Sequence, residues 1–266
     1  RAKNVPVVQT LHNFGVTCVN GLLYRDGRSC EDCLGRPVSW NGILHRCYRG
    51  SLAASAANAL SVATHRSAGT WVRKVDAYIA LSEFSREKFL AAGLPAGRIH
   101  VKRNFLEDIA NGRSAAAVSG LEDKRPFLFV GRLSPEKGID ILLEAWRRLP
   151  TGTAKLRIIG VGAQSGRVAA ACAADPSITW DGYLPAAGVE AALSEAQALV
   201  FPTLCYENCP MVVIEAFRAG VPVIASDGGS VVEMVKSDET GWLFSKGDAQ
   251  GLADTVLRLK AEPDRL

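Results

Sequence analysis

Residues 127–138 read FLFVGRLSPEKG, a short apolar run that ends in a glycine and a charged, polar stretch. An uninterrupted apolar run of this length is typical of a strand buried on both faces of a sheet. In residues 139–149 the apolar side chains then recur at the spacing of one helix face. The stretch therefore predicts a strand, a loop and a helix, the repeating unit of a parallel sheet.

The same alternation continues to the end of the chain. Strands are expected at residues 155–159, 178–180, 198–202, 221–225 and 241–244. Helices are expected at residues 167–174, 188–195, 210–219 and 231–235, and around Leu252, Val256 and Leu259. This rhythm predicts a doubly wound parallel sheet with helices on both faces.

The first part of the chain has a weaker version of this pattern. It predicts strands at residues 5–8, 77–81 and 99–102, and helices at residues 51–71 and 82–92. Residues 15–50 show little periodicity, and so long an irregular segment indicates a function or a stabilising staple. We expect a partial N-terminal domain at 1–112, a linker at 113–122 and a second domain at 123–266.

The composition excludes several classes of protein. Apolar residues make up 48% and charged residues 22% of the 266 residues, which excludes disordered chains and coiled coils. Residues 1–112 hold 15 Lys and Arg against 8 Asp and Glu. This excess fits an anionic partner such as phospholipid headgroups or nucleic acid, or equally an ordinary solvated surface, because the basic residues are scattered.

The loop at residues 131–138 is the first candidate site. Gly131 lets the backbone approach a ligand, while Arg132 and Lys137 are placed to converge on one anion such as a diphosphate. The alternative is an ordinary helix start, with Ser134 as N-cap and Pro135 at the first helical position.

The second candidate site is the loop at residues 206–215, YENCPMVVIE. Pro210 suits a first helical position, and the free N–H groups of a helix start form an anion site. Glu215 has apolar neighbours in sequence, a costly place for a carboxylate without a hydrogen bond. Glu215 as a plain surface charge is the alternative. A glycine turn at residues 226–230 is a weaker third candidate.

These segments, in this order, resemble the donor domain of the retaining family-4 glycosyltransferases of the GT-B fold. The resemblance covers residues 123–266 and rests on Gly131-Arg132-Leu133, Lys137-Gly138, the E-x7-E spacing of Glu207 and Glu215, Gly220-Val221-Pro222-Val223 and Gly241-Trp242-Leu243. In the first half it rests on Thr10-Leu11-His12-Asn13, Ser82-Glu83-Phe84 and Lys102-Arg103-Asn104-Phe105.

The resemblance implies an α/β fold with two Rossmann-like, doubly wound parallel-sheet domains that face a cleft. The family's first strand and glycine-rich loop have no counterpart before Val5, and Leu266 precedes the family's terminal helix. We therefore expect the N-terminal domain to be incomplete, with donor binding more robust than turnover.

The resemblance also implies roles for individual residues. Arg132 and Lys137 would hold the diphosphate of a UDP- or GDP-sugar, Glu215 the ribose, and Glu207 and His12 the donor sugar. The implied catalytic set is His12, Arg132, Lys137 and Glu207. The implied donor-binding set is Gly131, Arg132, Lys137, Gly162, Tyr183, Leu184, Glu207, Asn208, Cys209, Pro210, Met211, Val212 and Glu215, with Gly160 also near the base.

Such an enzyme transfers the sugar with retention to a glycan or lipid-linked acceptor and needs no catalytic metal. We expect it in the cytoplasm, in peripheral contact with the inner face of the membrane, and not on nucleic acid. Two alternatives stay open: a nucleotide-sugar epimerase on the same fold, and a silent nucleotide-sugar-binding or zinc-stapled interaction module. No G-x-G-x-x-G follows a strand, which argues against a dehydrogenase.

Four of the seven cysteines lie close together in sequence, at Cys18, Cys30, Cys33 and Cys47. Four thiolates suit a tetrahedral structural zinc that would staple the irregular segment. Reduced, unlinked thiols are the alternative. An odd number of cysteines argues against a secreted disulfide framework and favours a reducing compartment.

Overall fold

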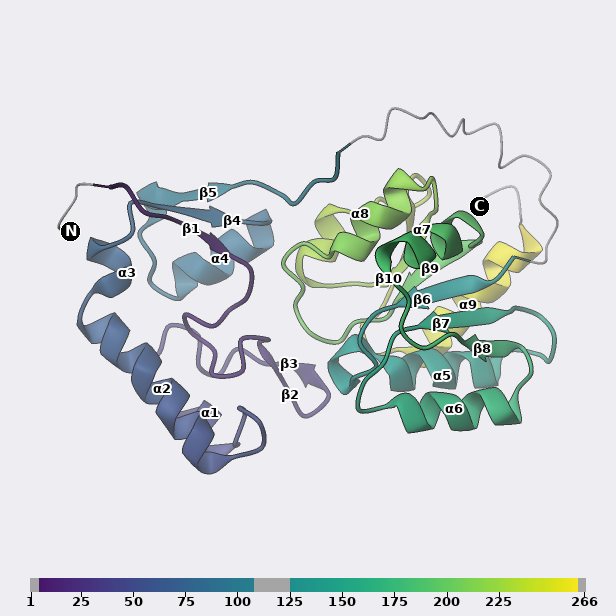
Figure 1. The fold of residues 1–266 in the computed structure, drawn as a ribbon, viewed down its shortest axis with the longest axis horizontal. Helices are drawn as coiled ribbons and strands as arrows, with labels where there is room; N and C mark the ends of the chain where they lie inside the picture. Colours follow the sequence, from purple (N-terminus) through teal and green to yellow (C-terminus); the bar gives the residue numbers. More distant parts are fainter. Residues whose placement is uncertain (1–4, 108–124, 263–266) are drawn as a thin grey trace. The chain divides into compact units, whose positions relative to one another are not determined.

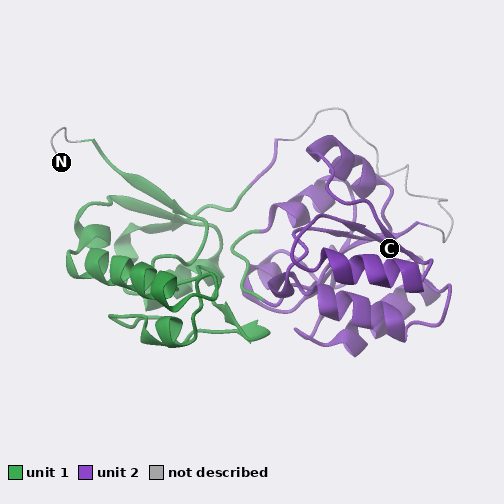
Figure 2. Ribbon diagram, turned by 60° about the horizontal axis from the view of Figure 1, so that its bottom comes forward, with its two compact units in different colours: residues 1–104, 205–209 green, residues 105–204, 210–266 purple. Residues whose placement is uncertain are grey.

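The computed structural model describes residues 5–107 and 125–262, and the structural statements below concern these residues. The contacts divide the chain into two compact units, shown in Figure 2. Unit 1 comprises residues 1–104 and Cys205–Cys209, and unit 2 comprises residues 105–204 and 210–266. The expected linker at 113–122 lies outside the described residues, and the expected domain boundaries stay a prediction.

Unit 2 contains one sheet of six parallel strands in the order β11-β10-β9-β6-β7-β8 (Figure 1). The strands are β6 (Phe127–Val130), β7 (Leu156–Ile159), β8 (Ile178–Trp180), β9 (Ala198–Phe201), β10 (Val223–Ser226) and β11 (Gly241–Phe244). The helices are α5 (Ile139–Arg148), α6 (Ser165–Ala174), α7 (Ala186–Ser194), α8 (Met211–Arg218) and α9 (Ala249–Ala261). The doubly wound parallel sheet predicted from the sequence is confirmed.

The two faces of this sheet are covered by different helices. Along β6, Phe127 and Phe129 pack into one apolar cluster with residues of α5, α6 and α9. Leu128, between them, packs into a second cluster with residues of α7 and α8. This division follows from the alternation of side chains along a strand, and it explains why the strands are apolar on both sides.

The strand order reverses between β6 and β9, which are hydrogen-bonded neighbours. In a doubly wound sheet this switch point opens a crevice outside the carboxyl ends of the two strands, where ligands bind. The loops that follow β6 and β9 are the two segments singled out from the sequence.

Unit 1 contains a three-stranded parallel sheet in the order β1-β4-β5. Its strands are β1 (Val8–Leu11), β4 (Ala77–Ala80) and β5 (Ile99–Val101), and its larger helices are α2 (Leu52–Ser67) and α4 (Glu83–Ala91). Ser82 caps α4, because its hydroxyl accepts from the N–H of Ser85 at 3.0 Å. Between β1 and α2 lie only the hairpin β2 (Tyr24–Arg25)–β3 (Arg28–Ser29) and the short helix α1 (Trp40–Leu44).

Several expected boundaries were wrong. The helix expected at 51–71 breaks at Gly69, whose φ of 62° starts the separate helix α3 (Thr70–Arg73). The first strand begins at Val8 rather than Val5. Pro210 is the N-cap of α8 rather than its first helical residue. The helix expected at 231–235 is the 3-10 helix η4 (Gly229–Glu233).

Candidate donor-binding site

The loop after β6 is organised around Glu136, a buried acid that the sequence did not single out. Its carboxylate accepts a hydrogen bond from Ser134 at 2.7 Å and pairs with Arg132 at 3.1 Å. Its carbonyl accepts from the Leu204 N–H at 2.8 Å, which ties this loop to the one after β9. The Arg132 side chain is 62% exposed and contacts Glu136 through Nη2. The rest of its guanidinium can therefore bind an anion. The sequence signal that could have indicated this ion pair is the four-residue spacing between Arg132 and Glu136.

Ser134 and Pro135 do start a helix, but a different one from that expected. They begin the 3-10 helix η3 (Pro135–Lys137), in which the Ser134 hydroxyl makes no capping bond. Lys137 is half-buried at its end, and α5 starts after Gly138. Lys137 and Arg132 therefore belong to one loop at the end of β6, as expected.

Glycines bring the strand-end loops into close contact. A Cβ at Gly138, which has φ 74°, would lie 1.9 Å from the carbonyl oxygen of Pro202. A Cβ at Gly160 would lie 1.8 Å from the carbonyl oxygen of Gly131, and one at Gly162 would lie 2.3 Å from that of Leu133. These glycines therefore permit backbone-to-backbone packing. Their closeness to a ligand base stays a prediction.

The segment before α8 leads directly to Glu215. Pro210 caps the helix without a side-chain bond, so the first-turn N–H groups at Met211 and Val212 have no partner inside the helix. Glu215 lies one turn further along and is half-buried. Within residues 5–107 and 125–262 its carboxylate has no ion pair or hydrogen bond, so its oxygens are available to a ligand.

Tyr183 and Leu184 follow β8. Tyr183 is 74% exposed, and Leu184 packs against the cluster beneath α7 and α8. The N–H of Gly160 donates to the carbonyl of Gly182 at 2.7 Å, so the ends of β7 and β8 stay together. The resemblance implies that the backbone around Tyr183 and Leu184 frames the nucleotide base, and this role stays a prediction.

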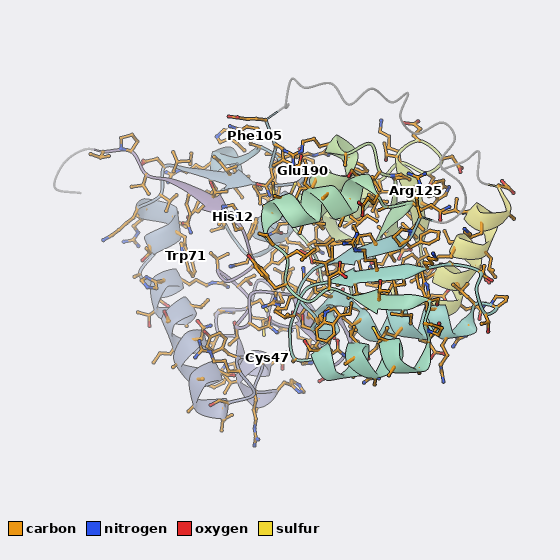
Figure 3. The ribbon with its side chains drawn as sticks, turned by 45° about the vertical axis from the view of Figure 1, so that its right-hand side comes forward. His12, Cys47, Trp71, Phe105, Arg125 and Glu190 are labelled. Carbon is orange, nitrogen blue, oxygen red and sulfur yellow. The ribbon has the colours of Figure 1, made fainter. Side chains whose placement is uncertain are left out.

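The remaining expected residues belong to unit 1. His12, labelled in Figure 3, is exposed directly after β1. Glu207 lies near the Cys205 thiol, at 3.7 Å, and Asn208 is 6% exposed. The Asn208 side-chain amide donates to the Leu11 carbonyl at 3.5 Å, but its own Oδ1 has no partner among the described residues. The two halves of the E-x7-E pair thus fall in different units.

The four clustered cysteines line one small cavity together with Arg25 and Gly42. All are free thiols. Burial and the neighbouring Cys18 raise the pKa of Cys47 to about 11, and burial raises the pKa of Cys33. Among the described residues, no three His, Cys, Asp or Glu side chains are gathered closely enough to hold a metal ion. The zinc expectation is therefore not confirmed by the side-chain positions.

Comparison with known proteins gives the family. Residues 124–262, more than half of the chain, match the family described as glycosyl transferases group 1. The chain belongs to this family. It is 29% identical over 191 residues to the amylovoran biosynthesis glycosyltransferase AmsK of Erwinia amylovora, covering 68% of this chain and 46% of that protein. It is also 29% identical over 193 residues to a phosphatidyl-myo-inositol mannosyltransferase of Mycobacterium leprae, covering 71% and 51%.

Comparison with a solved structure of another protein identifies the fold of this chain. HepE of Anabaena in complex with UDP superposes with a TM-score of 0.69 at 19% identity, covering 98% of this chain and 64% of that one. The α/β fold of the GT-B type is therefore confirmed. The chain spans about half the length of the two curated relatives. Within the described residues, no helix has the length and apolarity to cross a membrane.

Proposed function

We propose that this group 1 chain carries the donor site of a glycosyltransferase that moves a sugar from a UDP- or GDP-sugar to a glycan or lipid-linked acceptor. The observation that carries the proposal is the half-buried Glu215 carboxylate, which has no partner in the described structure. It follows the strand β9 at the switch point of the sheet. A carboxylate in this position can accept hydrogen bonds from two vicinal hydroxyls, such as those of a ribose.

The charges around this crevice fit the rest of a nucleotide-sugar. Arg132 and Lys137 come from the loop after β6, and the amides of Met211 and Val212, which have no partner inside the helix, begin the helix after β9. Cations and helix-start amides together stabilise a diphosphate, and they stabilise it more as the sugar–phosphate bond breaks and charge accumulates. In this mechanism Glu136 orients the Arg132 guanidinium, and the family resemblance assigns Glu207 and His12 to the donor sugar.

Two further features belong to the proposal. Retention of configuration rests on the family resemblance, with the departing phosphate assisting attack on the same face of the sugar. The relatives named for amylovoran and for phosphatidyl-myo-inositol support a glycan or lipid-linked acceptor. The basic excess of residues 1–112 supports transfer on the cytoplasmic side, beside anionic lipid.

Product analysis tests the proposal. The chain is incubated with UDP-glucose, UDP-galactose or GDP-mannose and with soluble or lipid-linked sugar acceptors. We expect free nucleoside diphosphate and a new glycoside whose anomeric configuration, measured by NMR, matches the donor. An isomerised sugar nucleotide would instead show an epimerase. Binding of nucleotide without product for every pair would contradict turnover by this chain and leave a binding module.

A further inference from the structure

We propose that residues 36–74 form a surface that docks unit 1 on a membrane of anionic phospholipid. The first observation is a charge pattern in the sequence. Residues 33–75 contain no Asp or Glu, although acids make up 27 of the 266 residues. The same stretch contains the basic residues Arg36, Arg46, Arg49, Arg66, Arg73 and Lys74. Its cations are spread along the sequence, but no acid of the stretch opposes their attraction for an anionic partner.

The structure leaves most of these cations available to an external anion. All except the half-buried Arg66 are exposed. Within residues 5–107 and 125–262, none of the exposed ones forms an ion pair with a carboxylate. An arginine without a carboxylate beside it can turn its planar fork of N–H donors to the oxygens of a phosphate. The headgroups of anionic phospholipids present such oxygens at the membrane surface.

Large apolar side chains are exposed among these cations. Trp40 is 64% exposed and Leu44 is 70% exposed. They lie four residues apart on α1, so both project from the same face of this helix. Leu52, Leu60 and Val72 are also exposed, and α1 packs against α2, which carries the first two of these. Exposed apolar side chains that gather in one region mark an interaction surface.

The outward face of α2 has the composition of a contact surface. Ala53, Ala57, Leu60 and Thr64 are exposed, and they recur at the spacing of one helix face. The opposite face of α2 is buried inside unit 1. A helix face in water usually carries charged side chains, whereas these four side chains are all uncharged.

A turn between α1 and α2 presents two of the arginines beside these apolar side chains. Arg46 and Arg49 have φ values of 50° and 56°, which bulky residues rarely adopt. The Tyr48 N–H donates to the Ser55 hydroxyl at 2.9 Å, which ties the turn to α2. Figure 1 shows α1 and the first turn of α2 at the end of unit 1 away from its parallel sheet. The turn therefore holds cations and apolar groups together at one end of the unit.

This combination fits an anionic bilayer better than other partners. Tryptophan and leucine side chains enter the boundary between headgroups and acyl chains, while arginines stay at the lipid phosphates. Nucleic acid attracts cations and stacks on aromatic rings, but it offers no apolar environment for Leu44, Leu52 and Leu60. A second copy of the chain on this surface would bring like charges together across a symmetric interface.

The inference deepens the proposed function and rests on it for the purpose of the contact, which brings the enzyme to a lipid-linked acceptor. Binding to vesicles needs neither donor nor acceptor, so it is measured by itself. Vesicle binding without sugar transfer would count against the proposed function alone. Transfer to a soluble acceptor without vesicle binding would count against this inference alone.

The test is co-sedimentation of the chain with vesicles of phosphatidylglycerol and phosphatidylcholine, and with vesicles of phosphatidylcholine alone. We expect binding to the mixed vesicles that weakens as the salt concentration rises, and no detectable binding to the neutral ones. The double variant Arg46→Gln, Arg49→Gln should lower the partition coefficient about 25-fold, or about 5-fold for each arginine. Arg258→Gln, which removes an exposed cation of α9 in unit 2, is the control and should bind like the wild type.

Brominated lipid tests the apolar part of the surface. We expect it to quench the tryptophan fluorescence of the wild-type chain, and Trp40→Phe to lose most of this quenching. Trp40→Ser should lower the partition coefficient about 10-fold, because its ring no longer enters the bilayer. Phe105→Ser removes a ring that is 67% exposed outside residues 36–74 and should leave binding unchanged. Each substituted side chain is exposed, so circular dichroism should match that of the wild type.

Four outcomes would overturn the proposal. The first is a folded wild-type chain that does not bind anionic vesicles at low salt. The second is an equal loss of binding in the arginine double variant and in Arg258→Gln. The third is displacement of the vesicles by a low concentration of single-stranded DNA, which would show a nucleic-acid surface. The fourth is a dimer in solution that Trp40→Ser dissociates, which would show an interface between two copies.

Discussion

The carboxyl edge of the sheet in unit 2 and residues 12–50 of unit 1 reach their structures by different routes. At the sheet edge, each loop begins where a buried strand ends and closes where a helix begins, so its position follows from the fold. Residues 12–50 contain strands of only two residues and a helix of five. The comparison teaches that a regular scaffold positions the proposed donor site, whereas the irregular segment is held by side-chain hydrogen bonds to its backbone, such as those from Ser39 to the Thr17 carbonyl and from Asn58 to the Val19 carbonyl.

The largest expected effect comes from a substitution that disrupts the loops at the carboxyl edge of the sheet in unit 2. Gly138→Ala introduces a Cβ at positive φ and 1.9 Å from the Pro202 carbonyl oxygen, so the loops after β6 and β9 must separate. We expect a loss of about 3–4 kcal/mol in the free energy of unfolding of unit 2. Peptide-resolved hydrogen exchange measures this for each unit separately.

Gly152→Ala is the matched control for this change. Gly152 also has positive φ, 79°, but a Cβ there would meet nothing within 4 Å. The expected loss is therefore only about 1 kcal/mol. Equal losses for the two variants would show that the close approach at Gly138 is unimportant.

The next effect tests the regular part of unit 1. Tyr78 on β4 is fully buried, and its hydroxyl donates to the Trp71 carbonyl at 2.7 Å. Burial raises the pKa of Tyr78 to about 12. The unfolded chain therefore loses this proton near pH 10, before the folded chain does, and stability falls as the pH rises from about 10 to 12.

We expect the wild-type chain to lose up to about 2.7 kcal/mol over this range, the equivalent of two pKa units. Tyr78→Phe should be about 1 kcal/mol less stable at pH 7, because the Trp71 carbonyl loses its donor, and should lack this part of the alkaline loss. Denaturant midpoints followed by circular dichroism from pH 8 to pH 12 measure both. An identical alkaline slope in wild type and variant would contradict the assignment.

The smallest expected effect concerns a substitution within the irregular residues 12–50 of unit 1. Gly42→Ala places a Cβ 2.4 Å from a methyl group of Val19, a side chain that can shift where a backbone carbonyl cannot. The crowding is offset by the better helix propensity of alanine, so we expect a net loss of about 1 kcal/mol in unit 1. Gly166→Ala on α6 has nothing within 4 Å and should stabilise by about 0.5–1 kcal/mol. A Gly42→Ala variant as stable as Gly166→Ala would show that α1 packs loosely.

The sequence predicted unit 2 well for a physical reason. Buried parallel strands such as Phe127–Val130 read as apolar runs, and amphipathic helices such as α5 repeat at helical spacing. The observed helix boundaries differ from the predicted ones where two local preferences compete. Pro210, for example, suits both the N-cap and the first helical position, and in the structure it is the N-cap of α8.

The sequence could not predict the interior of residues 12–50 or the part played by Glu136. The turns near the cysteines use non-glycine residues at positive φ, such as Leu23 and Arg46, which no local pattern indicates. Glu136 looks like one half of an ordinary surface pair with Arg132, and only its burial and its link to Leu204 reveal that it joins two loops. Both depend on contacts distant in sequence.

Calorimetric titration of UDP and GDP into the wild-type chain, Glu215→Gln and Glu87→Gln tests the central claim most directly. Glu87 is an exposed acid on α4 and serves as the control. We predict that one nucleotide binds the wild type and Glu87→Gln equally. Glu215→Gln should bind it about 10–100-fold more weakly, because a charge-assisted hydrogen bond contributes about 1.5–3 kcal/mol. Equal affinity in all three chains, or no binding to a folded wild-type chain, would contradict the assignment of Glu215 to the donor site.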